Sequence, residues 1–347
     1  LPCADITAVR CSNDTSEWLL VGTQRRYKET RLNIAIVGSG LIGQAWAIVF
    51  ARAGLQVRLW DGDANALANA KTIITQQLHA LEAHKLVDNA AHAIKCIQTC
   101  ESLSQALENA HYVQENLPER LEIKCDIYAA MDEMAAPDTI LASSTSGIPA
   151  SAFTESLANR QRCLVAHPVN PPYLIPVVEI CGAPWTDPLI LERTREIMRT
   201  VGQKPVTVNQ ELEGFVLNRL QGALLREAFR LVQQGVVSVE DLDTTVKDGL
   251  GLRWSFMGPF ETIDLNAPAG LADYCQRYGP LYQRMFEDRG DTDPWTNELI
   301  NDIEAQRRNI LPASELGNRR QWRDERLMAL LGHKQTVNNT SNEPEES

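Results

Sequence analysis

The sequence predicts an α/β fold in which a doubly wound, mostly parallel sheet is followed by an all-helical second domain. Short apolar runs alternate with segments of helical periodicity from residue 33 to residue 208. This alternation is typical of parallel strands joined by crossover helices. After Gly214 the apolar residues recur only at helical spacing, which predicts a domain of helices and loops. With 347 residues, the chain is long enough for two domains.

The first predicted strand–turn–helix unit carries a chemical signal. An apolar run, 34–37, leads into a turn with the spacing GxGxxG, and a helical pattern follows the turn. The glycines are Gly38, Gly40 and Gly43. In this pattern the first glycine permits a tight turn, the second lets a pyrophosphate approach the backbone, and the third lets the helix pack closely on the strand. The start of the helix offers free N–H groups to phosphates.

A second apolar run, 56–60, ends at Asp61. An acidic residue about 20 positions after the glycine turn is suited to bind a ribose 2′-hydroxyl. A 2′-phosphate would be repelled there, and no arginine follows directly to offset the charge, so the sequence predicts NAD rather than NADP as cofactor. An ordinary glycine-rich turn is the alternative. Because strand, helix and acid all stand in the expected order, a Rossmann-type dinucleotide site is favoured.

The remaining elements are predicted from apolar runs and helical periodicity. Helices are expected over 64–85, 120–134 and 187–201, and strands over 94–97, 111–115, 139–142, 163–166, 177–180 and 205–208. A helical stripe between 217 and 231 opens the second domain, and Ser238 is expected to cap the next helix. The predicted domains are an N-terminal extension, 1–32, an NAD-binding domain, 33–212, a helical dimerisation domain, 213–335, and a disordered tail, 336–347.

Composition narrows the class of partner. The net charge of -12 argues against a nucleic-acid partner. No apolar run approaches the roughly 20 residues of a membrane span, so no membrane partner is expected. The eight cysteines form no CxxC pair and are interpreted as reduced thiols, and the histidines show no metal-ligand spacing, so no metal site is expected. Without a signal-peptide pattern, the cytoplasm is the expected location.

His167 follows the apolar run 163–166, and Glu179 lies in the next predicted strand. A dehydrogenase needs a base for the hydroxyl proton while a hydride leaves the same carbon, and histidine titrates near the working pH. A carboxylate behind the ring would fix its tautomer and stabilise the imidazolium. On spacing alone, a histidine that ends a strand and a glutamate that pairs elsewhere are favoured, because isolated His and Glu residues are common.

Further motifs stand in the order of a known family. They are 114–119 (QENLPE), 143–146 (SSTS), 167–171 (HPVNP) and 214–219 (GFVLNR). With the glycine turn and Glu179, they resemble the 3-hydroxyacyl-CoA dehydrogenase family over residues 33 to 334. The resemblance implies NAD-dependent oxidation of a 3-hydroxy group to a 3-keto group, and it favours the catalytic interpretation of His167 and Glu179.

The resemblance implies roles for the residues that match the family's motifs. His167 would be the general base, or the acid in the reverse direction, and Glu179 would orient it. Ser146 and Asn218 would hydrogen-bond the reacting oxygen of the substrate. The resemblance also implies contacts with the cofactor. The backbone of Leu41 and Ile42 would bind the pyrophosphate, Glu119 and Lys124 would lie at the nicotinamide end, and Asn170 would lie near that end. The alternatives are a helix N-cap for Ser146 and a solvated helix charge for Lys124.

The substrate is predicted to be a small 3-hydroxy acid. A CoA thioester carries phosphates that need basic partners, and the resemblance places CoA contacts on the helix after Asp61. The segment 62–110 has only three lysines as basic residues, against five carboxylates. Arg253 stands in a glycine-bounded loop and could clamp a substrate carboxylate bidentately. A salt bridge between the domains is an equal alternative for Arg253.

The resemblance also ranks the substrates. The segments 251–262 and 319–325 are most similar to family members that oxidise L-gulonate to 3-dehydro-L-gulonate, which is the leading prediction. The sequence of the segment 253–258 also resembles that of family members that oxidise L-carnitine. A 3-hydroxyacyl-CoA thioester is a further alternative substrate. A purely structural role is the non-enzymatic alternative. The presence of His167, Glu179, Ser146 and Asn218 argues against it. Because subunits of this family pair through the helical domain, a homodimer is predicted.

Overall fold

The computed structural model describes residues 32–286 and 296–319 and the single positions 322, 326 and 333. Contacts divide the chain into two units, Leu1–Leu224 and Leu225–Ser347, which are described separately. The predicted N-terminal extension, apart from Leu32, and the predicted tail 336–347 lie outside the described residues. The domain boundary expected at residue 212 stays a prediction.

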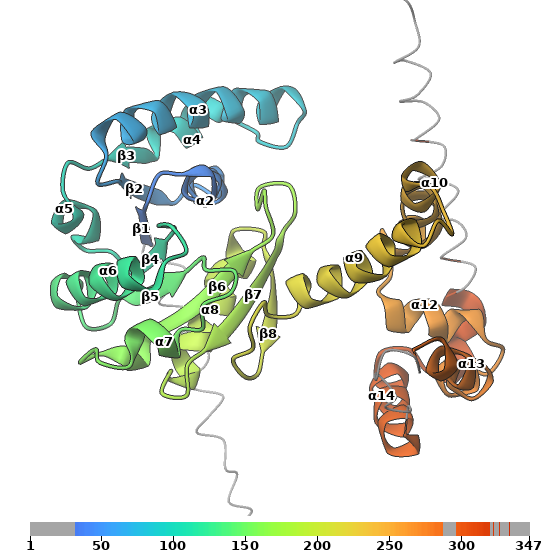
Figure 1. Ribbon diagram of the computed structural model, residues 1–347. Helices are drawn as coiled ribbons and strands as arrows, with labels where there is room; N and C mark the ends of the chain where they lie inside the picture. Colours follow the sequence, from blue (N-terminus) through green and yellow to red (C-terminus); the bar gives the residue numbers. More distant parts are fainter. Residues whose placement is uncertain (1–31, 287–295, 320–321, 323–325, 327–332, 334–347) are drawn as a thin grey trace, which may run out of the picture. The chain divides into compact units, whose positions relative to one another are not determined.

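The first unit is built on an eight-stranded sheet with the strand order β3-β2-β1-β4-β5-β6-β7-β8 (Figure 1). The strands are β1 (Asn33–Val37), β2 (Gln56–Trp60), β3 (Ile97–Thr99), β4 (Tyr112–Glu115), β5 (Ile140–Ser143), β6 (Cys163–Pro168), β7 (Val177–Gly182) and β8 (Lys204–Val208). All neighbours are parallel except β6 and β7, which are antiparallel. The predicted doubly wound, mostly parallel sheet is confirmed. The strand order reverses between β1 and β4, where such sheets bind ligands.

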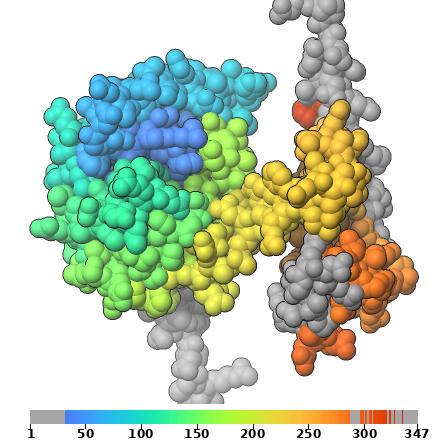
Figure 2. All heavy atoms as spheres, in the orientation of Figure 1, coloured from blue at the N-terminus to red at the C-terminus, as the bar shows by residue number. Residues whose placement is uncertain are grey.

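Helices cover both faces of this sheet. One face packs against α2 (Leu41–Arg52), α3 (Ala64–Ala83), α4 (Ala90–Lys95) and α8 (Pro188–Thr200), and the other against α5 (Leu103–Leu107), α6 (Leu121–Met134) and α7 (Ser151–Thr154). Successive strand residues point to opposite faces, so Ile34 and Ile36 enter the first core while Ala35 and Val37 enter the second. The side chains of the first unit form a continuous surface over these layers (Figure 2).

The region between β2 and β4 differs from the sequence prediction. The strand expected over 94–97 is wrong, because α4 runs to Lys95 and the strand β3 begins only at Ile97. The side chain of Asn89 accepts a hydrogen bond from the N–H of His92 at 2.8 Å, and this cap starts a helix before the apolar residues. The short helix α5 was not predicted either. Its cap is Ser102, which accepts a hydrogen bond from the N–H of Gln105.

The described part of the chain after β8 consists of helices and loops, as predicted. Its elements are α9 (Leu217–Gln233), α10 (Val239–Thr244), the π-helical turn η2 (Thr245–Leu250), α11 (Gly251–Trp254), α12 (Pro259–Asn266), α13 (Leu271–Phe286), α14 (Asn297–Ile310) and the 3-10 turn η4 (Ala313–Glu315). Another 3-10 turn, η1 (Arg160–Arg162), precedes β6 in the first unit. Ser238 caps α10 as predicted, accepting from the N–H of Asp241 at 3.1 Å. Among the described residues, no helix has the length and apolar character to cross a membrane.

Candidate active site

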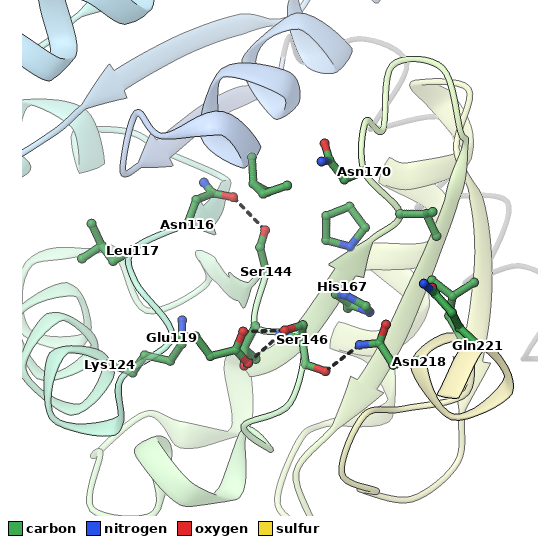
Figure 3. Close-up of a pocket in the computed structure, with 15 residues that line it drawn as sticks. Asn116, Leu117, Glu119, Lys124, Ser144, Ser146, His167, Asn170, Asn218 and Gln221 are labelled. Atoms are coloured by element: carbon green, nitrogen blue, oxygen red, sulfur yellow. Dashed lines mark hydrogen bonds between the residues drawn. The ribbon is translucent and has the colours of Figure 1, made fainter. Parts of the chain in front are cut away.

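A pocket of about 480 Å³ lies in the first unit at the carboxyl ends of the central strands (Figure 3). Its walls come from the start of α2, the segments that follow β4 and β5, the end of β6 with the loop after it, and the first turns of α9. This is the edge of the sheet at which doubly wound folds bind ligands. The volume is in the range of small-molecule sites.

His167 and Glu179 form a hydrogen-bonded pair at the wall of this pocket. They are register partners across the antiparallel strands β6 and β7, and both are buried. His167 Nδ1 lies 2.8 Å from Glu179 Oε2. Since Nδ1 is engaged and the ring lines the pocket, Nε2 is the nitrogen left for a substrate. The sequence placed His167 just past a strand, whereas the structure places it inside β6.

Glu179 also holds the start of α9. Its second oxygen, Oε1, accepts hydrogen bonds from the backbone N–H groups of Val216 and Leu217 at 2.8 and 2.9 Å. Burial acts to raise the pKa of Glu179, but the hydrogen bonds from His167, Leu217 and Val216 outweigh it, so the pKa lies below its ordinary value. The carboxylate therefore stays charged beside the imidazole at neutral pH.

The turn before α9 makes this arrangement possible. Gly214 has φ +76°, and Phe215 has φ +47°, a conformation that bulky residues rarely adopt. Phe215 is fully buried, and its ring centroid lies 5.6 Å from that of His167. Sequence reasoning missed Phe215 as a neighbour of the site. The available signal was its position between Gly214 and the helical stripe.

Ser146 and Asn218 meet at the same pocket. Asn218 Nδ2 donates to the backbone carbonyl of Ser146 at 3.3 Å, and both residues line the pocket with His167 (Figure 3). The Ser146 hydroxyl donates to Glu119 Oε2. The N-cap alternative for Ser146 is wrong, because the next helix, α7, has Ala150 at its N-cap position. The structure therefore brings together the four residues expected at the reacting carbon.

Glu119 holds the loop that follows β5. Its Oε1 accepts from Thr145 Oγ1 at 2.7 Å and from the backbone N–H groups of Ser146 and Gly147 at 2.9 and 2.6 Å. Burial acts to raise the pKa of Glu119, but hydrogen bonds from the Ser146 and Thr145 side chains and from this backbone outweigh it and lower the pKa. The contact expected between Glu119 and the nicotinamide end of the cofactor stays a prediction.

Lys124 is buried beneath the pocket. Its Nζ lies 2.9 Å from Glu115 Oε2 and 3.3 Å from Ser143 Oγ, and Ser143 donates to the same Glu115 oxygen at 2.6 Å. The alternative of a solvated helix charge is wrong, because the Lys124 side chain is 1% exposed. Sequence reasoning missed Glu115, although an acidic residue that ends an apolar strand was a visible signal. The role of Lys124 toward the cofactor stays a prediction.

The glycine turn has the shape that a dinucleotide needs. A Cβ on Gly43 would lie 1.9 Å from the Gly38 carbonyl oxygen, so the helix can pack this closely only with glycine there. A Cβ on Gly40 would project into open space. No side chain caps α2 and its first turn holds no acidic residue, which leaves the N–H groups of Leu41 and Ile42 for an anion. These features fit the pyrophosphate of NAD.

Asp61 follows β2 and faces the glycine turn. Its Oδ2 accepts from the Ser39 N–H at 2.6 Å and the Ser39 hydroxyl at 2.8 Å, and its Oδ1 accepts from the Asp63 N–H at 2.9 Å. A carboxylate has about four acceptor positions, so these three bonds leave capacity for a ribose hydroxyl. Ser39 was missed by sequence reasoning. Asn170, also predicted near the cofactor, lines the pocket on the side of α2 (Figure 3).

Two predictions concern the rest of the chain. The loop expected around Arg253 is wrong, because Arg253 lies in the helix α11 of the second unit. Its contact with a substrate carboxylate stays a prediction. Within the described ranges, no group of three or more His, Cys, Asp or Glu side chains could hold a metal ion.

Comparison with protein families gives two adjacent matches. The model of the 3-hydroxyacyl-CoA dehydrogenase NAD-binding domain matches residues 33–211, and that of the C-terminal domain of the same family matches residues 214–311. Together they cover most of the chain. The expected family is therefore confirmed.

Individual relatives agree with this assignment. A lambda-crystallin homologue from Bos taurus is 42% identical over 302 residues, which is 86% of this chain and 94% of that protein. An L-carnitine dehydrogenase from Pseudomonas putida is 35% identical over 307 residues, which is 86% of this chain and 92% of that protein. The structure also resembles a solved 5-formyl-3-hydroxy-2-methylpyridine 4-carboxylic acid 5-dehydrogenase, an NAD⁺-dependent dismutase, with a TM-score of 0.67 and 30% identity, over 85% of this chain and 99% of that chain. The chain belongs to the 3-hydroxyacyl-CoA dehydrogenase family and is an NAD-dependent dehydrogenase.

Proposed function

We propose that the protein oxidises a small 3-hydroxy acid to the 3-keto acid with His167 and Glu179 as its catalytic dyad, and that L-gulonate is the leading substrate. The observation that carries the proposal is the 2.8 Å hydrogen bond between His167 Nδ1 and Glu179 in a pocket that Ser146 and Asn218 also line. A base, its orienting carboxylate and two partners for the reacting oxygen are the groups that alcohol oxidation needs.

The dyad handles the proton. His167 Nε2 takes the proton of the substrate hydroxyl, and the charged Glu179 carboxylate stabilises the imidazolium that forms. Bound NAD supplies the acceptor for the hydride that leaves the same carbon. In the reverse direction the imidazolium returns the proton to the keto oxygen.

Asn218 and Ser146 hold the reacting oxygen. Asn218 Nδ2 has two hydrogens, and only one is used in the bond to the Ser146 carbonyl. The second can be donated to the substrate oxygen as negative charge develops on it. The Ser146 hydroxyl lies between Glu119 and the pocket, so its hydrogen can turn from the carboxylate to the substrate.

A free acid is favoured over a CoA thioester by the chemistry of α3 and α4. Helix α3 is 20 residues long and holds one lysine and no arginine, and α4 holds one lysine. A CoA binder presents basic groups to several phosphates, and these helices present few. The likeness to lambda-crystallin homologues and to L-carnitine dehydrogenases, rather than to acyl-CoA enzymes alone, points the same way.

L-Carnitine is the second candidate. It is favoured by the 35% identity to the Pseudomonas putida L-carnitine dehydrogenase. Carnitine is itself a 3-hydroxy acid, so the same dyad would serve it.

The cytoplasm remains the proposed location, supported by cysteines that are free in the described residues. A homodimer is also proposed, and the exposed Leu220 and Phe229 on α9 support it.

The test is NADH formation with equal concentrations of L-gulonate, L-carnitine, L-3-hydroxybutyrate and 3-hydroxybutyryl-CoA. The proposal expects the highest kcat/KM with L-gulonate. A preference for L-carnitine would move the assignment to the second candidate. A preference for the CoA thioester would contradict the free-acid argument and leave the proposed roles of the dyad standing. No turnover of any of these compounds would contradict the proposed reaction.

A further inference from the structure

One polar side chain on the substrate side of the pocket has no role in the mechanism above. Gln221 lies on α9 three residues after Asn218, so the two side chains share one face of the helix. Both line the pocket, and Figure 3 shows them next to each other, whereas Asn170 lies on the side of α2. Gln221 therefore stands with the residues that hold the substrate rather than with those expected at the cofactor.

The charged groups of the pocket already have partners. Lys124 is paired with Glu115, and Glu119 accepts five hydrogen bonds from the loop after β5. By contrast, the side chain of Gln221 makes no hydrogen bond to another side chain or to the backbone within the described part of the chain. Its carboxamide is thus available to a ligand, and it is neutral.

The chemistry of a carboxamide selects its partner. A carboxamide offers one acceptor oxygen and two donor hydrogens, which complement a hydroxyl group because a hydroxyl both donates and accepts. Carboxylates and phosphates are bound more strongly by cationic side chains, and a quaternary ammonium by aromatic faces. Gln221 is exposed, so an alkyl chain against it would displace water from the amide without replacing the hydrogen bonds, at a cost in binding.

We propose that Gln221 is a specificity-determining residue that hydrogen-bonds a hydroxyl of the substrate beyond the reacting carbon. The pocket then selects polyhydroxylated acids over 3-hydroxy acids with a bare alkyl chain. This inference rests on the proposed function, since it assumes that a small 3-hydroxy acid occupies the pocket. It adds a residue and a chemical criterion that separate L-gulonate from L-3-hydroxybutyrate. Sites that hydrogen-bond a substrate hydroxyl discriminate against analogues that lack it.

The test compares two substrates in the variant Gln221→Leu, which keeps the size of the side chain and removes its hydrogen bonds. Loss of one neutral hydrogen bond lowers kcat/KM for L-gulonate by about 3- to 10-fold, chiefly through KM. The kcat/KM for L-3-hydroxybutyrate and the Kd for NADH stay unchanged. Gln233→Leu, at the other end of α9 and outside the pocket lining, is the matched control and leaves both substrates unaffected.

The outcomes separate this inference from the proposed function. Unchanged kinetics for L-gulonate in Gln221→Leu, or equal losses for both acids, would overturn the role of Gln221 while leaving L-gulonate as the substrate. A wild-type enzyme that does not oxidise L-gulonate would overturn both the substrate assignment and the inference.

Discussion

Replacement of Glu179 by glutamine tests the dyad most directly. Glutamine keeps the shape of the side chain, but only one of its two terminal atoms, the oxygen, can accept hydrogen bonds. The carboxylate accepts from His167 Nδ1 and from two backbone N–H groups of the turn into α9. In Glu179→Gln the NH₂ group must face one of these donors, so either the histidine or the helix loses its partner.

The expected magnitude follows from the bond that is lost. A hydrogen bond to a charged group contributes about 1.5–3 kcal/mol, and most of this value is expected in the transition state because the imidazolium forms there. The kcat/KM should therefore fall by roughly 10- to 150-fold. The assay is steady-state NADH formation, with Glu155→Gln as the control because Glu155 is exposed and lies away from the pocket. Wild-type kcat/KM in Glu179→Gln would refute the role of Glu179.

The pH dependence of stability gives a second readout of the same residue. Because the folded-state pKa of Glu179 is lowered, the charged carboxylate stabilises the fold at pH values above its unfolded-state pKa of about 4.3. This contribution disappears as the pH falls through the lower, folded-state pKa. Glu179→Gln should lack this component, so its Tm should fall less than that of the wild type on acidification from pH 6 to pH 3. An equal fall in Tm for the wild type and the variant on acidification would show that Glu179 does not contribute to the pH dependence of stability.

Three further substitutions test other parts of the site. His167→Ala should lower kcat by about 10²- to 10⁴-fold with NADH binding retained, and near-normal turnover would exclude His167 as the base. Asp61→Ala removes the carboxylate that binds Ser39, so Kd for NAD should rise and the preference over NADP should shrink; an unchanged NAD/NADP ratio would contradict the ribose assignment. Glu119→Gln should lower kcat about tenfold by loosening the loop that carries Ser146, whereas a rise only in Kd for NAD would indicate that Glu119 acts at the nicotinamide end.

The dinucleotide turn could be predicted because its signals are local. Gly43 is required by its approach to the Gly38 carbonyl, and Gly38 has φ +95°, a conformation that favours glycine. Sequence spacing therefore contains nearly all of the information. The prediction of a strand over 94–97 was wrong for an equally local reason, because Asn89 caps a helix that extends into the apolar run.

The catalytic pair could not be derived from spacing. His167 and Glu179 meet only because β6 and β7 run antiparallel in a sheet that is otherwise parallel, and no residue count reveals that change of direction. The resemblance to a known family implied the pair, but not the antiparallel strands that bring it together. Likewise, the choice of Glu115 as the partner of Lys124 depends on burial from several elements, which a helical pattern does not encode.

The pairing of β6 with β7 has a consequence for how substrate range can change in evolution. The geometry of the dyad is inherited from strand register, and a slip of one residue would turn His167 to the other face of the sheet. The loop between the two strands and the outer turns of α9 lie outside this register. Length and composition can therefore drift in those segments without moving the reacting groups. An ancestral dehydrogenase with this hairpin could exchange one hydroxy acid for another through substitutions at pocket positions outside the register, such as Gln221, while its proton chemistry remained constant.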